Sequence, residues 1–157
     1  MLTLKEQAEI CRIGLITGLL SQCEIIGWAD GIIEADNEPD SAVIDISLMG
    51  SADLPALVSA LFDVKGEACS GKVLSAVLGV CADKLRHGRL AADEAAAVLD
   101  RLAPDTSCRR CNIRAEYAAP VDPETAAIIR AALAENAVAV FLAPYAACAA
   151  DITFERA

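Results

Sequence analysis

Apolar residues recur at helical spacing along most of this chain, and this periodicity constrains the fold more than any other feature. A capping box, Thr3-x-x-Glu6, opens the first periodic stretch, and a second one, Ser21-x-x-Glu24, opens the next. Apolar stripes with three- and four-residue spacing continue to about residue 103. No strand-like stretches alternate with them. We therefore predict an all-α fold, a helical bundle or stacked helical hairpins with about seven or eight helices.

Turn and capping residues divide the remaining chain into further helices. After the two capped stretches, the expected helices are a short one within 40–49, one from about 51–55 up to Gly66, one closed by Gly88, one over 92–102, and one that begins at Asp122-Pro123. From residue 137 to 157 the pattern is ambiguous, because AVAVFL fits either a continued helix or a short strand.

The composition favours one domain with an aliphatic core. The chain has 157 residues, 55% of them hydrophobic but only 4% aromatic, so Leu, Ile, Val and Ala must fill the interior. We predict a single all-α domain over 1–157. The only candidate for a long loop is 104–121, which is also where a sub-boundary would fall.

A weak internal repeat appears at an offset of 70 residues. Seven residues within 4–30 recur at that offset, as duplicated helical hairpins would show. Two unrelated hairpins that obey the same capping and packing rules explain the matches equally well. The matching residues are Leu4, Cys11, Leu15, Gly18, Leu20, Glu24 and Asp30, followed by Leu74, Cys81, Leu85, Gly88, Leu90, Glu94 and Asp100.

The negative charge is concentrated in one segment. Residues 13–64 contain nine acids and no Lys or Arg, whereas the rest of the chain holds 14 acids and 13 bases. Six of the nine acids lie between residues 28 and 45. A surface with this charge repels nucleic-acid phosphates and anionic lipids, so we expect no nucleic-acid partner.

Other features bear on the compartment. The longest apolar run, 137–150, has 14 residues and contains Pro144, whereas a membrane-spanning helix needs about 20 apolar residues. The first residues lack the basic start of a signal peptide. Seven cysteines, an odd number, several of them at apolar helix positions, fit reduced thiols. We expect a cytoplasmic protein with no membrane contact, and the sequence leaves a homo-oligomer open.

The acidic turn departs from the template of a metal site. Asp36, Glu38 and Asp40 have the spacing of the first three ligands of a calcium loop. Ser41 and Ser47 stand where that loop needs Gly and Glu, so a solvated turn is favoured.

Two further groups could carry chemistry. Cys108 and Cys111 form a C-x-x-C motif beside arginines that would lower a thiol pKa, but no second ligand pair completes a zinc site. Redox, metal-binding and incidental interpretations of this pair stay open. The only histidine, His87, has no nucleophile motif beside it. The sequence favours a protein that is not an enzyme and needs no cofactor.

The unbalanced acids favour recognition of a basic protein, because complementary fields raise association rates. Trp28 lies in the apolar stripe of the second helix, either as a core residue or as a partly exposed anchor beside the acids. The alternative function is a metal- or small-ligand-binding helical protein with minor catalytic activity. The candidate partner-binding residues are Asp30, Glu34, Asp36, Glu38, Asp40 and Trp28.

A family resemblance points the same way. Residues 18–61, with the sequence GLLSQCEIIGWADGIIEADNEPDSAVIDISLMGSADLPALVSAL, combine a Trp-Ala-Asp motif, an acidic turn with Pro, and a short apolar helix. This stretch resembles a segment of small, all-helical bacterial proteins, some of which are similar to immunity proteins that neutralise toxins. The resemblance implies an all-α fold and a basic toxin as the partner.

Overall fold

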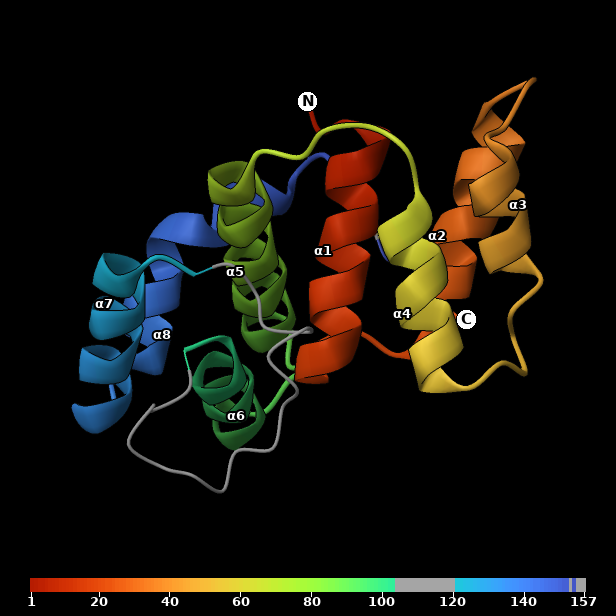
Figure 1. Ribbon diagram of the computed structural model, residues 1–157. Coiled ribbons are helices and arrows are strands. Elements are labelled where there is room, and N and C mark those ends of the chain that lie inside the picture. The colour runs from red at the N-terminus through yellow and green to blue at the C-terminus, as the bar shows by residue number, and fades with distance from the viewer. Residues whose placement is uncertain (104–120, 153, 155–157) are drawn as a thin grey trace. The chain divides into compact units, whose positions relative to one another are not determined.

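The computed structural model describes residues 1–103, 121–152 and 154, and over this part the chain forms helices and no strands (Figure 1). The all-α prediction is confirmed, and the described residues form eight α-helices. The helices are α1 (Leu4–Thr17), α2 (Gln22–Ala35), α3 (Ser41–Ser47), α4 (Leu54–Asp63), α5 (Ser70–Arg86), α6 (Ala92–Leu102), α7 (Pro123–Ala134), α8 (Val138–Leu142) and a final 3-10 helix, η2 (Ala143–Ala149).

The chain divides into two compact units. The N-terminal unit comprises residues 1–73 and the described residues from Ala150 onward, and the second unit comprises 74–149. In the N-terminal unit α2 packs on α3, and α4 packs on both α1 and α3. In the second unit α6, α7 and α8 pack on one another and η2 packs on α8. The sub-boundary expected at 104–121 falls almost wholly outside the described residues.

The first hairpin forms as its capping residues predict. The Thr3 hydroxyl accepts a hydrogen bond from the Glu6 N–H at 3.2 Å, and the Glu6 carboxylate accepts one from the Thr3 N–H at 2.8 Å, which completes the capping box of α1. Gly18 ends α1 in the left-handed conformation, with φ 78°. Ser21 then caps α2 in the same way with Glu24, so local hydrogen bonds define the turn between these two helices.

The turn between α5 and α6 repeats this arrangement 70 residues later. Gly88 has φ 67°, as Gly18 has φ 78°. The N–H of Leu20 donates to the carbonyl oxygen six residues earlier at 2.9 Å, and the N–H of Leu90 does the same at 3.2 Å. The two predicted hairpins are therefore present with matching turns. Duplication and convergence on the same capping rules both account for the match.

Each unit has its own aliphatic core, as the scarcity of aromatic residues requires. The N-terminal unit fully buries Ile10, Ile25, Ile46, Leu57 and Leu61. The second unit fully buries Leu78, Leu99, Leu102, Ile129 and Leu142. Burial of a side chain of this size stabilises a fold by roughly 1.5–3 kcal/mol relative to exposure.

The ambiguous segment after residue 136 is helical up to Ala149. Gly79 explains how η2 lies against α5 within the second unit. A Cβ atom on Gly79 would lie 2.6 Å from the carbonyl oxygen of Tyr145 and 2.9 Å from the nitrogen of Ala149. Only glycine allows the two backbones to approach this closely.

The left-handed turn at Gly88 gives a stability prediction. We expect Gly88→Ala to lower the free energy of unfolding by about 1–2 kcal/mol, because alanine must adopt a left-handed φ. A Cβ atom at Gly88 or at Gly71 meets no atom within 4 Å, but only Gly88 has a positive φ. Gly71→Ala is therefore the matched control and should leave stability unchanged or slightly raised. Urea unfolding measures both variants, and equal stabilities would contradict the strain at Gly88.

Candidate functional site

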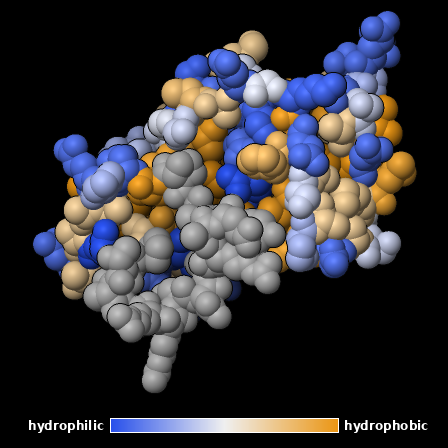
Figure 2. Space-filling view, viewed as in Figure 1, coloured by the Kyte–Doolittle hydropathy of each residue, from blue (hydrophilic) through white to orange (hydrophobic). Residues whose placement is uncertain are grey.

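The five acids predicted to bind a partner all lie on the α2–α3 hairpin. We call them the acidic face: Asp30, Glu34, Asp36, Glu38 and Asp40. Asp30 and Glu34 are exposed on α2, Asp36 and Glu38 are exposed in the turn, and Asp40 is half-buried at the start of α3. Figure 2 shows hydrophilic residues gathered at the tip of this hairpin, which is the orange turn between α2 and α3 in Figure 1. The negative charge is therefore presented to solvent.

Hydrogen bonds within the hairpin hold the acidic face in place. Asp36 and Asp40 each accept a hydrogen bond, through Oδ1, from the backbone N–H two residues later, at 3.0 and 2.8 Å. Asp30 accepts one from the hydroxyl of Ser47, which joins α2 to α3. The amide nitrogen of Gln22 donates to two backbone carbonyls in the loop after α3, at 2.8 and 3.1 Å. These hydrogen bonds thus restrain the conformation of the hairpin on which the acids lie.

No ion pair joins the acidic face to a base among the described residues. Several bases pair with other acids instead. Lys5 and Arg12 bind the two carboxylate oxygens of Glu9 at 3.0 and 2.7 Å, and Arg89 binds Asp83 at 2.6 Å. The field of the acidic face therefore extends into solvent, where salt screens it over about 8 Å at physiological ionic strength.

Trp28 is a core residue and not an exposed part of the acidic face. Its side chain is only 5% exposed, and its indole Nε1–H donates to Oε1 of Gln7 at 3.0 Å. This bond satisfies the polar group of a buried tryptophan and fixes the ring against α1. Of the two interpretations of Trp28, core packing agrees with this burial.

A pocket of about 380 Å³ lies beside Trp28, within the N-terminal unit. Two acids line it: Glu34, which also belongs to the acidic face, and Asp151, which follows η2. The sequence did not single out Asp151 or the other lining residues, because chain segments far apart in sequence meet there. The lining residues are Gln7, Gly27, Trp28, Gly31, Ile32, Glu34, Asp151 and Ile152.

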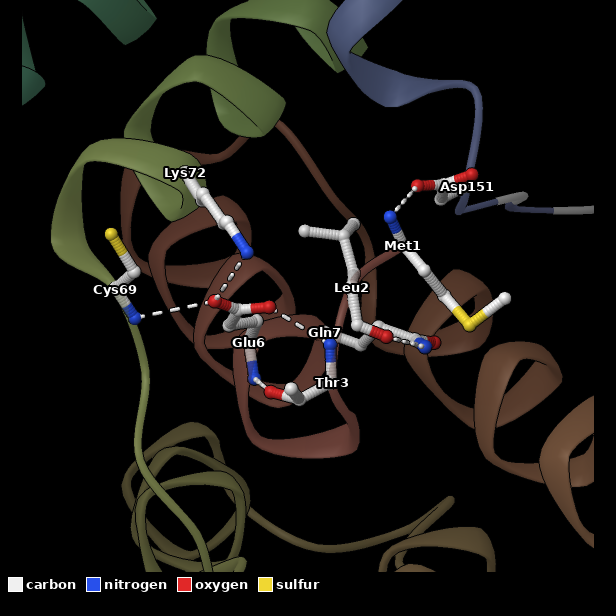
Figure 3. A network of polar contacts seen from close by, with 8 residues as sticks. All are labelled: Met1, Leu2, Thr3, Glu6, Gln7, Cys69, Lys72 and Asp151. Atoms are coloured by element: carbon white, nitrogen blue, oxygen red, sulfur yellow. Dashed lines mark hydrogen bonds and ion pairs between the residues drawn. The ribbon is translucent and has the colours of Figure 1, made fainter.

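A second polar network surrounds Glu6, which is only 3% exposed (Figure 3). The Glu6 carboxylate accepts from the Thr3 N–H, from the Cys69 N–H at 3.3 Å, and lies 3.9 Å from the ammonium group of Lys72. Cys69 directly precedes α5, so one carboxylate binds the N-terminal ends of two helices, where negative charge is stabilising. The network ties residue 3 to residue 69, and its role is structural.

The described residues gather no metal-binding cluster. Within 1–103, 121–152 and 154, no three His, Cys, Asp or Glu side chains stand close enough to hold a metal ion. The turn with the spacing of a calcium loop, at Asp36, Glu38 and Asp40, is among these residues. Cys108 and Cys111 lie outside the described residues.

The other cysteines fall into two groups. Cys11 and Cys81 are buried in their helices, as the apolar stripes predicted. Burial raises the pKa of the Cys11 thiol well above its ordinary value and that of Cys81 to about 11. Cys23, Cys69 and Cys148 are exposed.

Comparison of the chain with protein-family models, curated proteins and solved structures finds no match. Among the described helices, none has both the length and the apolar character that crossing a membrane requires.

The thiols provide one test of the structure. We expect a disulfide reagent at about pH 8 to modify Cys23 and Cys148 rapidly in the native protein, because both are exposed. Cys11 and Cys81 should react only when urea unfolds the chain, because burial removes access and disfavours the thiolate. Peptide mass spectrometry after timed labelling measures each site. Rapid native labelling of Cys11 would contradict the buried position of this helix face.

Glu6 provides a pH test. Its pKa is lowered from the ordinary 4.5, chiefly by the hydrogen bond from the Thr3 backbone, with a smaller contribution from the Cys69 backbone. The native state therefore holds this proton less tightly than the unfolded state does. The resulting stabilisation is complete above about pH 4.5 and is lost as the pH falls through the lower native pKa.

We expect the melting temperature of the wild type to fall more steeply between about pH 6 and pH 3 than that of Glu6→Gln. The matched control is Glu67→Gln, because Glu67 is exposed and lies in the same unit. That control should keep the wild-type slope. Parallel curves for Glu6→Gln and the wild type would show that Glu6 does not contribute to the acid lability.

Proposed function

We propose that this protein is an interaction protein whose acidic face docks a basic protein partner. The observation that supports the proposal is that four of these five acids are exposed on one braced hairpin, and none of the five forms an ion pair with a base among the described residues. Charge spread over the whole surface would serve solubility equally well, but here the charge is segregated. A segregated field favours recognition, because it steers an oppositely charged protein to one place.

The position of the acids on α2 also supports a role outside folding. Glu34 lies in the last turn of α2, and Asp36 is its C-cap residue. The C-terminal end of a helix carries partial negative charge, so acids there are unfavourable for stability by a few tenths of a kcal/mol or more. A benefit in binding offsets this cost.

Within this class, we assign the protein to the toxin-neutralising, immunity-type group in the cytoplasm. The likeness of residues 18–61 to small bacterial helical proteins supports the group, and the basic character of many toxins that act on nucleic acid matches the acidic face. Within the part of the chain that the structure describes, five cysteines are free thiols, which supports a reducing compartment; they are Cys11, Cys23, Cys69, Cys81 and Cys148.

A second candidate function is small-ligand binding, and the pocket beside Trp28 favours it. Its volume of about 380 Å³ falls within the range of roughly 300–1,000 Å³ found for small-molecule sites. The two functions predict different ligands. The first predicts binding of a basic protein, and the second predicts binding of a small molecule.

Charge reversal outside the pocket tests the proposed function. We expect Asp36→Lys with Glu38→Lys to slow association with the partner at least about tenfold at low salt, because steering is lost. The difference should shrink to about twofold or less at 0.5 M salt. Thermal stability should be nearly unchanged, since the lost Asp36 turn bond is offset by better charge at the end of α2.

The partner for this measurement is the protein captured from the source cells by the wild-type chain but not by the charge-reversed chain. Surface plasmon resonance then gives its association and dissociation rates. The matched control is Glu67→Lys with Glu135→Lys, which changes the net charge equally at exposed residues away from the hairpin. The proposal is wrong if both double variants lose the same proteins, or if the captured partner is acidic.

A further inference from the structure

Gly31, an exposed glycine in the interior of α2, lies in the lining of the pocket beside Trp28. A Cβ atom on Gly31 would meet nothing within 4 Å, and Gly31 lines the pocket. No contact requires glycine there, yet glycine inside a helix costs about 1 kcal/mol relative to alanine. A larger side chain at this position therefore has open space beside the pocket lining, and substitution of Gly31 can test whether a ligand uses that space.

The lining of the pocket matches a cation carried on an aliphatic stem. Glu34 and Asp151 provide two carboxylates, while Ile32 and Ile152 provide apolar walls. Lysine and arginine side chains have this amphipathic form, with an apolar stem and a charged head. The indole of Trp28 also lines the pocket, but it is only 5% exposed, so it contributes an edge of the wall and not an open stacking face.

Asp151 already holds one ammonium group in this structure. The amino group of Met1 lies 3.1 Å from Oδ2 of Asp151 (Figure 3). Both side chains are solvent-accessible. An exposed pair of this kind is weak and exchanges readily. Asp151 is thus able to bind a cation without a rearrangement of the backbone.

Glu34 joins the pocket to the acidic face. Because it belongs to both, a basic protein steered to the acidic face arrives beside the pocket opening. We propose that the pocket receives one lysine or arginine side chain of the basic partner, and that this side chain anchors the complex. The inference rests on the proposed function and adds its anchoring contact. Steering by Asp36 and Glu38 governs the association rate, whereas insertion into the pocket governs the dissociation rate.

The cation preference is tested first with a small probe. Trp28 is the only tryptophan, so intrinsic fluorescence reports on the pocket directly. n-Butylguanidinium should change this fluorescence saturably, at millimolar concentrations. n-Butylurea, which has the same shape without the charge, should bind at least tenfold more weakly. Glu34→Gln should weaken the response to butylguanidinium several-fold.

Variants of Gly31 test whether the cation binds in the space beside this residue. Gly31→Leu fills the pocket with an aliphatic side chain and should abolish the fluorescence response, while Gly31→Ala should retain it. Both should fold at least as stably as the wild type, because leucine and alanine are better helix formers than glycine. An unaltered response in Gly31→Leu, or equal binding of butylurea and butylguanidinium, overturns the proposal.

The partner protein decides what occupies the pocket in the complex. We expect Gly31→Leu to raise the dissociation rate of the captured partner at least tenfold, with the association rate nearly unchanged. The double variant Asp36→Lys with Glu38→Lys should instead slow association and leave the dissociation rate nearly unchanged. If Gly31→Leu binds the partner as the wild type does while butylguanidinium still binds the wild type, the pocket takes a free small cation and the anchoring role is wrong. In that case the effect of Asp36→Lys with Glu38→Lys still stands, so the two proposals fail separately.

Discussion

The buried carboxylate of Glu6 is the interaction on which the N-terminal unit depends. It accepts hydrogen bonds from the N–H groups of Thr3 and Cys69, at the beginnings of α1 and α5. Unpaired N–H groups and the helix dipole make both places favourable for negative charge. The chain between them, α1 to α4, is thereby closed into a loop with fixed ends. The α2–α3 hairpin is carried within this closed segment.

Two acids of the hairpin, Glu34 and Glu38, contrast with Glu6 in burial and in hydrogen bonding. Glu6 is buried and accepts backbone hydrogen bonds, whereas Glu34 and Glu38 are exposed and without ion pairs among the described residues. The 52 residues from 13 to 64 contain no Lys or Arg at all, so nothing in the local sequence can neutralise the hairpin. Glu6 thus stabilises the fold from a buried position, whereas the carboxylates of Glu34 and Glu38 face solvent.

Local features of the fold were predictable from the sequence, and long-range ones were not. The capping boxes, the left-handed glycines Gly18 and Gly88, and the start of α7 after Asp122 are set by residues within one turn of each other. The contact of Glu6 with Cys69 joins residues 63 positions apart, and no rule of sequence spacing predicts it. The exposure of most of the acids agreed with the expectation, whereas the pocket required the meeting of α1, α2 and the segment after η2.

Hydrogen–deuterium exchange of the full chain with and without its captured partner tests the central claim most directly. If the acidic face and the adjoining pocket form the interface, slower exchange should be confined to the α2–α3 hairpin, the turn at 36–40 and the backbone around Gln7 and Asp151. The helices of the second unit should exchange equally in the free and bound protein. Protection centred on α6 and α7, with none at 28–45, would contradict the account.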